Sequence, residues 1–205
     1  MYLDYLNEVD SLKQVKFIAL TFDDGPDSLY TPLILDVLKE KKVTATFFLI
    51  GEKMKRYPEV TKRIFTEGHC MANHTFSHIR FLDKSITVIY NDLMQTEKLI
   101  NSVCGNSQKI FRPPFGRITK KQNIRLLKLG FKIVLWNLDS KDYISGSTKD
   151  NIVNKVISEA GNDKVVLFHS ADYSGKKSRM NTVMALPEII DKLRSQNYVF
   201  VKVNQ

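Results

Sequence analysis

Short apolar runs alternate with longer amphipathic segments along almost the whole chain, and this alternation restricts the fold more than any other feature of the sequence. Seven runs have the length and composition of buried strands: 16–22, 43–50, 69–73, 110–113, 132–137, 164–169 and 198–203. Helical spacing of apolar residues appears between them, in 32–41, 54–67, 86–103, 120–129, 149–160 and 182–196. This strand-helix repeat predicts parallel strands joined by right-handed helical crossovers, in either an open doubly wound sheet or a closed barrel.

Residues at the segment ends agree with this assignment. Thr31 can cap a helix that begins at Pro32, because a proline in the first turn loses no hydrogen bond. A glycine that can adopt the left-handed conformation follows four of the helical segments: Gly68, Gly105, Gly130 and Gly161.

The composition is typical of soluble globular proteins. With 205 residues, 43% of them apolar and 26% charged, the chain can bury a substantial core, and no apolar stretch is long enough to span a membrane. We take residues 1–15 as a lead-in segment and residues 16–205 as one domain. The lead-in lacks the apolar core of a secretory signal, so either the protein stays inside the cell or this chain begins after an export segment.

The net charge restricts the kinds of partner this chain can bind, and the cysteines bear on whether it has a thiolate site. A net charge of +9 favours an anionic partner, such as nucleic acid, a membrane surface or an acidic polymer of the cell envelope. Lysine pairs are spread along the chain without a dense basic block, which argues against nucleic acid. Cys70 and Cys104 form no CxxC motif and are predicted to be separate thiols in the apolar core.

Polar residues of the types found in active sites follow the predicted strands. The carboxyl ends of parallel strands meet at one edge of a sheet or barrel, where functional side chains gather. The residues placed there are Asp23, Asp24, His74, Arg112, Asp139 and His169. Taken alone, the two aspartates of TFDDGP are ordinary turn residues, since Asp-Gly-Pro is a common exit from a strand.

The segment NHTFSH offers a metal site. His74 and His78 are four residues apart, so on one helical turn both imidazoles would point to the same side and bind one ion. A catalytic metal site needs a third ligand, and Asp24 is the candidate. The neighbouring Asp23 would then be free to act as a base, with Arg112 offsetting the repulsion between the two carboxylates.

The chain resembles the polysaccharide deacetylases of carbohydrate esterase family 4. The resemblance rests on five motifs in order, TFDDGP, HTFSH, RPPFG, WNLDSKDY and VLFHS, and extends over residues 16–203. It implies a distorted α/β barrel of the (β/α)7 type, with parallel strands and outer helices. It also implies a metal-dependent hydrolase that removes acetyl groups from the amino sugars of chitin-like or peptidoglycan polymers.

The resemblance assigns the metal ligands and the base. Asp24, His74 and His78 match the metal triad, which would hold one divalent ion, with zinc expected and cobalt or nickel also suited. Asp23 matches the catalytic base, and Arg112 matches the residue that holds it.

The same resemblance assigns the remaining site residues. His169 matches the general acid, and Asp139 matches the group that orients and charges this histidine. The backbone N–H of Phe115 matches an oxyanion donor, Leu167 an apolar residue near the acetyl methyl, and Tyr143 an aromatic substrate-binding residue.

Three departures from the family pattern bear on the substrate. Tyr143 stands where tryptophan is more usual, Phe115 where tyrosine is frequent, and Ser170 where an acidic residue is more usual. Cations in the loop after His169 either face an anionic polymer or are simply solvated: Lys176, Lys177 and Arg179. Within the site segments, His69 and Trp136 are interpreted as structural and core residues.

The expected function is therefore removal of N-acetyl groups from a polysaccharide, with peptidoglycan as the expected substrate and a chitin-type oligosaccharide as the alternative. A catalytically inactive glycan-binding relative and a basic nucleic-acid-binding protein are the competing classes. By the resemblance, the protein would act outside the cell or at the cell wall, and it is expected to be a monomer.

Overall fold

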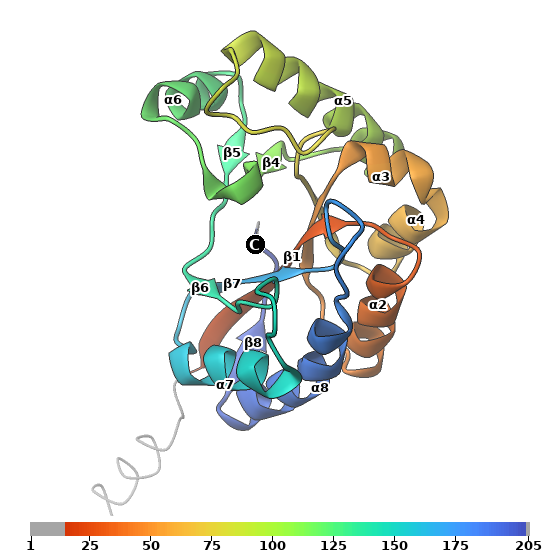
Figure 1. Ribbon diagram of the computed structural model, residues 1–205, viewed down its shortest axis with the longest axis vertical. Helices are drawn as coiled ribbons and strands as arrows, with labels where there is room; N and C mark the ends of the chain where they lie inside the picture. The colour runs from red at the N-terminus through yellow and green to blue at the C-terminus, as the bar shows by residue number, and fades with distance from the viewer. Residues whose placement is uncertain (1–14, 204–205) are drawn as a thin grey trace, which may run out of the picture.

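The computed structural model describes residues 15–203, which form a curled parallel sheet surrounded by helices (Figure 1). The strands are β1 (Lys16–Gly25), β2 (Thr46–Leu49), β3 (Cys70–Asn73), β4 (Ile110–Phe111), β5 (Lys132–Ile133), β6 (Leu138–Asp139), β7 (Lys164–His169) and β8 (Tyr198–Phe200). Their order is β5-β4-β3-β2-β1-β7-β6, with β8 paired to β1, and every pairing is parallel. The predicted parallel α/β fold is confirmed.

The sheet curls into a half-barrel that stays open between β5 and β6. Residues 132–137 were predicted to form one strand, but only Lys132–Ile133 pairs with β4, and the chain then crosses to β7 as β6. The carbonyls of Val134 and Leu135 accept hydrogen bonds from the Arg112 side chain at 3.0 and 3.1 Å. An arginine therefore satisfies backbone groups that a neighbouring strand would satisfy in a closed barrel.

Helices cover the outside of the sheet. They are α2 (Tyr30–Glu40), α3 (Gly51–Arg56), α4 (Pro58–Thr66), α5 (Ile86–Cys104), α6 (Lys120–Lys128), α7 (Lys149–Glu159) and α8 (Met180–Ser195), with a short 3-10 turn at Pro114–Gly116. The predicted helix over 54–67 is two helices, because Pro58 lacks the N–H that would continue the first one. No helix among residues 15–203 is long and apolar enough to cross a membrane.

Two of the predicted helix ends differ in the structure. Helix α2 begins at Tyr30, and Asp27 accepts the N–H groups of Leu29 and Thr31, so Thr31 is not the cap. The Thr31 hydroxyl instead donates to the Ser170 carbonyl at 3.0 Å and ties α2 to the loop after β7. Gly161 does not end α7 in the left-handed region, whereas the other three glycines do adopt positive φ after their helices.

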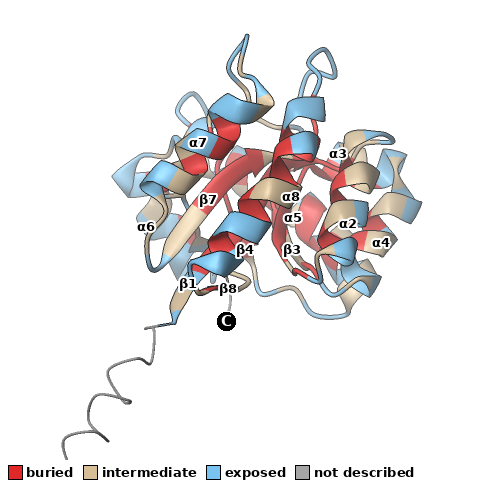
Figure 2. Ribbon diagram, turned by 90° about the horizontal axis from the view of Figure 1, so that it is seen from below, coloured by how far each residue is buried: buried red, intermediate tan, exposed pale blue. Residues whose placement is uncertain are grey.

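The core lies where the sheet meets its helices (Figure 2). Strand β1 is central, and all eight of its residues from Ile18 to Gly25 are buried. The ring of Phe22 stacks on Phe47 at 5.0 Å and on Phe168 at 5.5 Å, and these rings join β1 to the strands on both sides. Burying a side chain of this size stabilises the fold by about 1.5–3 kcal/mol. The strand that carries the two aspartates is therefore anchored in the core.

The cysteines are unpaired thiols, as predicted, but they are not fully buried. Cys70 and Cys104 are both half-buried. Burial raises the pKa of the Cys70 thiol, which keeps it protonated at neutral pH.

Candidate active site

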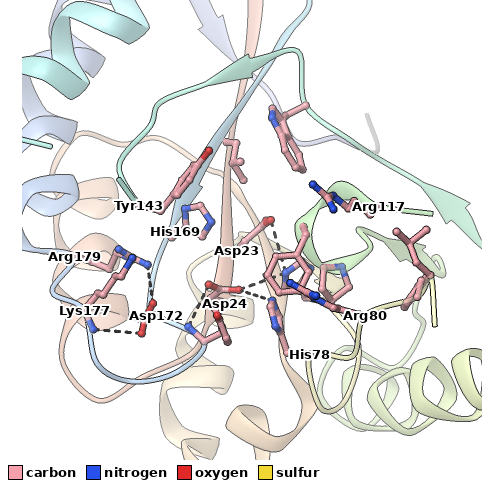
Figure 3. A pocket seen from close by; sticks show the side chains of 18 of the residues that line it. Asp23, Asp24, His78, Arg80, Arg117, Tyr143, His169, Asp172, Lys177 and Arg179 are labelled. Atoms are coloured by element: carbon pink, nitrogen blue, oxygen red, sulfur yellow. Dashed lines mark hydrogen bonds and ion pairs between the residues drawn. The ribbon is translucent and has the colours of Figure 1, made fainter. Parts of the chain in front are cut away.

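A cavity of about 450 Å³ lies at the carboxyl ends of the strands, at the opening of the half-barrel (Figure 3). Most of the residues singled out from the sequence line it: Asp23, Asp24, His74, His78, Phe115, Tyr143, Leu167 and His169. Of the six residues predicted at the carboxyl ends of the strands, Asp23, Asp24, His74 and His169 line the cavity, whereas Asp139 does not. Arg112 lies directly behind them and contacts Asp23.

The end of β1 places two adjacent carboxylates in the same cavity. Neighbouring side chains of a regular strand point to opposite faces. Asp24, however, has a φ of 70°, and the pairing of β1 with β2 shifts register between Phe22 and Gly25. This break in the strand geometry lets Asp23 and Asp24 line one site.

Asp24, His74 and His78 bring one ligand atom each to a common point, all within 4.8 Å of one another. The Nε2 atoms of His74 and His78 lie 3.4 and 3.3 Å from Oδ1 of Asp24. Burial raises the pKa of Asp24, but hydrogen bonds from the two histidines outweigh it and hold the pKa well below its usual value. The donor set, two imidazoles and an ionised carboxylate on one small volume, fits a divalent metal ion.

The spacing predicted that the two histidines lie on one helical turn, but the structure places them on a loop. Residues 74–80 form an irregular loop in which Thr75 and His78 have φ of 69° and 54°. One side chain of α5 fixes this loop: Asp92 accepts the N–H of Phe76 at 2.5 Å and the hydroxyl of Ser77 at 2.7 Å. The loop holds the imidazoles together, in place of the helical spacing that was expected.

The ring orientation of His74 suits a metal ligand. Its Nδ1 lies 2.9 Å from the Arg112 carbonyl oxygen, which can only accept a hydrogen bond. Nδ1 therefore donates to this carbonyl, and Nε2 is the ring nitrogen that faces Asp24. For His78, burial lowers the pKa and keeps the imidazole neutral, as a ligand must be.

Arg112 holds Asp23 from behind the cavity. Its side chain is fully buried, and Nη1 donates to Oδ1 of Asp23 at 2.7 Å and to the Thr21 hydroxyl at 2.9 Å. The guanidinium also lies over the ring of Phe48, with its central carbon 3.9 Å from the ring centre. The predicted contact between Asp23 and Arg112 is present, and it leaves Oδ2 of Asp23 directed toward His74, at 3.9 Å.

The partner of His169 is Asp142, so the prediction of Asp139 in that place is wrong. Nδ1 of His169 lies 2.7 Å from Oδ1 of Asp142, whereas Asp139 contacts Lys141 and the Tyr143 hydroxyl. Lys141, with a φ of 61°, reverses the chain after β6 and brings the buried Asp142 under the end of β7. Burial alone would lower the pKa of His169, but the charge and hydrogen bond of Asp142 raise it to about 9.

Aromatic and apolar side chains wall the cavity. Leu167 lines its floor, the ring of Tyr143 lies edge-on to His169 at 5.3 Å, and Phe115 lies edge-on to His78 at 5.0 Å. Trp136 was expected in the core but lines the cavity, because it follows the point where β5 leaves the sheet. His69 is structural, as predicted: its Nδ1 accepts the N–H of Ala45, and burial lowers its pKa to about 4.

Helix α3 and the loop after β7 contribute residues that the sequence did not single out. The Lys53 ammonium donates to the carbonyls of Asp24 and Asp172 at 2.8 and 2.7 Å. Tyr173 donates its N–H to Oδ2 of Asp24 at 3.2 Å, and its ring stacks on His78 at 4.5 Å. No motif marks these residues, since their role depends on contacts between segments that are 29 to 149 residues apart in the chain.

The three cations of this loop differ in their environments. Arg179 also lines the cavity, but it is buried and paired with Asp172 at 3.1 Å, so its guanidinium is engaged within the protein. Lys177 lines the cavity, and Lys176 is exposed.

Residues 11–134 match the family described as polysaccharide deacetylase. The chain belongs to this deacetylase family. It is 39% identical over 184 residues to a peptidoglycan-N-acetylglucosamine deacetylase of Bacillus cereus, with 90% of this chain and 66% of that protein covered. It is 34% identical over 190 residues to the peptidoglycan-N-acetylmuramic acid deacetylase PdaC of Bacillus subtilis, with 93% and 38% covered. For PdaC, therefore, the chain spans well under half of the relative's length.

The fold of this deacetylase-family chain is also that of a solved relative. The crystal structure of the Bc1960 peptidoglycan N-acetylglucosamine deacetylase aligns with a TM-score of 0.87 at 37% identity, covering 93% of this chain and 87% of that one. The resemblance stated from the five motifs is therefore confirmed at the level of the family and of the barrel fold.

Proposed function

We propose that this chain is a metal-dependent amide hydrolase that removes acetyl groups from N-acetylated amino sugars of peptidoglycan. The observation that carries the proposal is one arrangement of side chains. On one side of the Asp24-His74-His78 cluster lies the Asp23 carboxylate, which is held by Arg112. On the other side lies the His169 imidazole, which is held by Asp142. A metal site, a base and an acid around one cavity are the parts that amide hydrolysis requires.

A divalent ion bound by this cluster would polarise the acetyl carbonyl and lower the pKa of a water molecule. Asp23 is the proposed base. Arg112 occupies its Oδ1, so Oδ2 is the atom available to take the proton of the attacking water. Because the Arg112 guanidinium is buried and hydrogen-bonded to two carbonyls, it holds the Asp23 carboxylate in one orientation.

The backbone N–H of Phe115 is the proposed donor to the oxygen that becomes negatively charged. Phe115 has a φ of 62°, a conformation that costs a non-glycine residue on the order of 1–3 kcal/mol and is concentrated at functional sites. Its place on the cavity wall beside His78 supports this role. A preorganised donor at this point would stabilise the tetrahedral intermediate more than the planar amide.

His169 is the proposed general acid. Its Nδ1 is engaged by Asp142, so Nε2 carries the proton that passes to the amine nitrogen as the carbon-nitrogen bond breaks. A pKa of about 9 keeps the imidazole protonated at neutral pH, as expulsion of an amine requires. Leu167 would then contact the acetyl methyl, and Tyr143 and Trp136 the sugar.

Zinc is the ion we propose for this site, and cobalt and nickel suit the same two imidazoles and carboxylate. All of the proposed groups come from one chain, which supports activity as a monomer. Peptidoglycan as the substrate places the working protein outside the cell or at the cell wall.

Acetate release tests the proposal. The metal-stripped protein would be titrated with zinc, cobalt or nickel and given either peptidoglycan strands or N-acetylglucosamine oligomers. We expect acetate in proportion to bound metal and faster turnover of the peptidoglycan strands. Faster turnover of the neutral oligomers would favour the chitin-type alternative. Binding of strands without acetate release under any of the three metals would identify an inactive glycan-binding relative.

A further inference from the structure

The arginines around the cavity fall into two classes. Arg112 and Arg179 are buried, and each is paired with a carboxylate of its own chain, Asp23 and Asp172 respectively. Arg80 and Arg117 line the cavity, are exposed to solvent, and form no ion pair with any residue in 15–203. The first pair builds the site, whereas the second pair has donors left for a ligand.

Arg80 is held in place although it has no acidic partner. Its guanidinium carbon lies 5.1 Å from the centre of the Phe115 ring, which itself lies edge-on to His78. One aromatic ring therefore separates this positive charge from a proposed metal ligand. A contact of this kind holds the guanidinium on the face of the ring. The N–H groups at the edge of the guanidinium stay free for hydrogen bonds.

Arg80 also lines a second cavity next to the first. A second cavity of about 570 Å³ shares His78, Arg80, Phe115 and Tyr173 with the first. A polymer that places one sugar at the proposed metal ligands can thus continue past Arg80. Figure 3 shows Arg80 and Arg117 on the side of the site across from Tyr143 and His169.

The charges on these walls decide what such a polymer should carry. Asp83 lines the first cavity and Glu52 the second, but neither forms an ion pair with Arg80 or Arg117. A neutral amino sugar offers only hydroxyl and amide groups, which gain little from two guanidinium ions. A carboxylate accepts two parallel hydrogen bonds from a guanidinium and is the group that this geometry matches best.

We propose that Arg80 and Arg117 bind a carboxylate of the substrate strand next to the reacting sugar, so that the cavity selects carboxylate-bearing amino-sugar polymers over neutral ones. This inference rests on the proposed function and narrows its substrate class. The two arginines would then determine which polymer binds, and the groups around Asp24 would carry out the hydrolysis.

The test compares one glycan in two forms. Peptidoglycan strands with free carboxylates would be used beside the same strands after conversion of the carboxylates to neutral methylamides. The metal-loaded wild type would be compared with R80Q, R117Q and the double variant. The matched control is R125Q, which removes the same charge from an exposed arginine of α6 outside both cavities.

We expect the wild type to show a KM for the free-carboxylate strands about tenfold lower than for the methylamides, the ratio typical of one charge-assisted hydrogen bond. The double variant should lose this preference and keep its rate on the methylamides within about twofold, and R125Q should behave as the wild type. Equal KM values for the two wild-type substrates would overturn the inference. So would a double variant that loses activity equally on both.

A binding measurement separates this inference from the proposed function. Calorimetric titration of the same proteins with both forms of the strand requires no turnover. If no protein releases acetate, the proposed function fails, while the ratio of the two dissociation constants still supports or overturns the role of the arginines.

Discussion

Asp142 forms two hydrogen bonds with His169. Its Oδ1 lies 2.7 Å from the imidazole Nδ1, and its Oδ2 accepts the backbone N–H of the same histidine at 2.8 Å. The Thr182 hydroxyl donates to Oδ2 at 2.9 Å and fixes the carboxylate from α8. This arrangement orients the ring and leaves Nε2 as the atom free to exchange a proton within the cavity.

Replacing Asp142 by asparagine should lower the rate and move its pH dependence. Asp142 is what raises the pKa of His169 to about 9, so the alkaline decline of kcat should begin near pH 9 in the wild type and at clearly lower pH in Asp142→Asn. We expect kcat at neutral pH to fall on the order of a hundredfold. Asp139→Asn is the matched control, because Asp139 does not touch His169. An unchanged alkaline limb in Asp142→Asn would contradict this assignment.

The same pair should make the metal-free protein less stable at alkaline pH. The folded pKa of His169, about 9, lies above the value near 6.5 expected in the unfolded chain. Its contribution to the free energy of unfolding is therefore fully present below about pH 6.5 and is lost as the pH rises through 9, by at most about 3 kcal/mol. Urea unfolding in the presence of a chelator, at intervals from pH 6 to 10, measures this. Asp142→Asn should show a much flatter profile over the same range, and equal slopes would argue against the pair.

The sequence was enough to predict the parallel sheet and most of the site, for a physical reason. Strands buried on both faces read as apolar runs, and their carboxyl ends must meet, so Asp24, His74 and His169 could be placed together without coordinates. The same reasoning found Arg112. These predictions depend on topology, which the repeat of strands and helices determines.

The errors arose where local geometry decides the outcome. WNLDSKDY contains two aspartates, and the turn at Lys141, with its positive φ, selects Asp142 over Asp139. The spacing of His74 and His78 suggested a helical turn, but hydrogen bonds from Phe76 and Ser77 to the Asp92 carboxylate hold an irregular loop. Trp136 was assigned to the core because the early end of β5 cannot be read from an apolar run.

Changing Asp23 to asparagine should abolish turnover and leave the metal site intact. The amide cannot accept a proton from water, so we expect kcat to fall by about a hundredfold or more. The proposed ligand atoms of Asp24, His74 and His78 are unchanged, so the metal content should stay near that of the wild type. Acetate release and metal analysis on the same sample check both parts. Normal acetate release from Asp23→Asn would refute the assignment of Asp23 as the base.

His78→Ala should lose metal and activity together. The substitution removes one of the three proposed ligands. The other two are fixed by their own hydrogen bonds: Nδ1 of His74 donates to the Arg112 carbonyl, and Oδ2 of Asp24 accepts the N–H of Tyr173. The remaining pair is expected to bind zinc at least about tenfold more weakly. Metal analysis after gel filtration, beside the wild type treated in parallel, measures this. A content near one ion per chain would show that His78 is not a ligand.

Breaking the contact between Arg112 and Asp23 should destabilise the fold as well as the site. Arg112→Met leaves the Asp23 carboxylate buried without its partner and the carbonyls of Val134 and Leu135 without their donor. Removing one member of a buried pair costs about 3–5 kcal/mol. Chemical unfolding measures the loss. Asp23→Asn should cost less, because the guanidinium keeps its hydrogen bonds to Thr21, Val134 and Leu135 and can still donate to the amide oxygen. A loss in Arg112→Met no larger than in Asp23→Asn would argue against this role for Arg112.

Lys53 should support metal binding without touching the ion. Its ammonium joins the carbonyl of Asp24 to that of Asp172, and so sets the loop whose Tyr173 N–H holds Oδ2 of Asp24. Lys53→Met removes both hydrogen bonds, so we expect zinc affinity to fall by about tenfold, as for other groups that orient a ligand. Amide hydrogen exchange over residues 170–179 should become faster at the same time.

The matched control is Lys62→Met, which removes the same charge from an exposed position on α4 away from both cavities. It should leave the zinc affinity and the exchange of the loop as in the wild type. If Lys53→Met and Lys62→Met weaken zinc binding equally, the effect is one of net charge. Unchanged exchange in Lys53→Met would mean that the loop after β7 is held by the contacts of Asp172 with Arg179, and that Lys53 does not set the position of Tyr173.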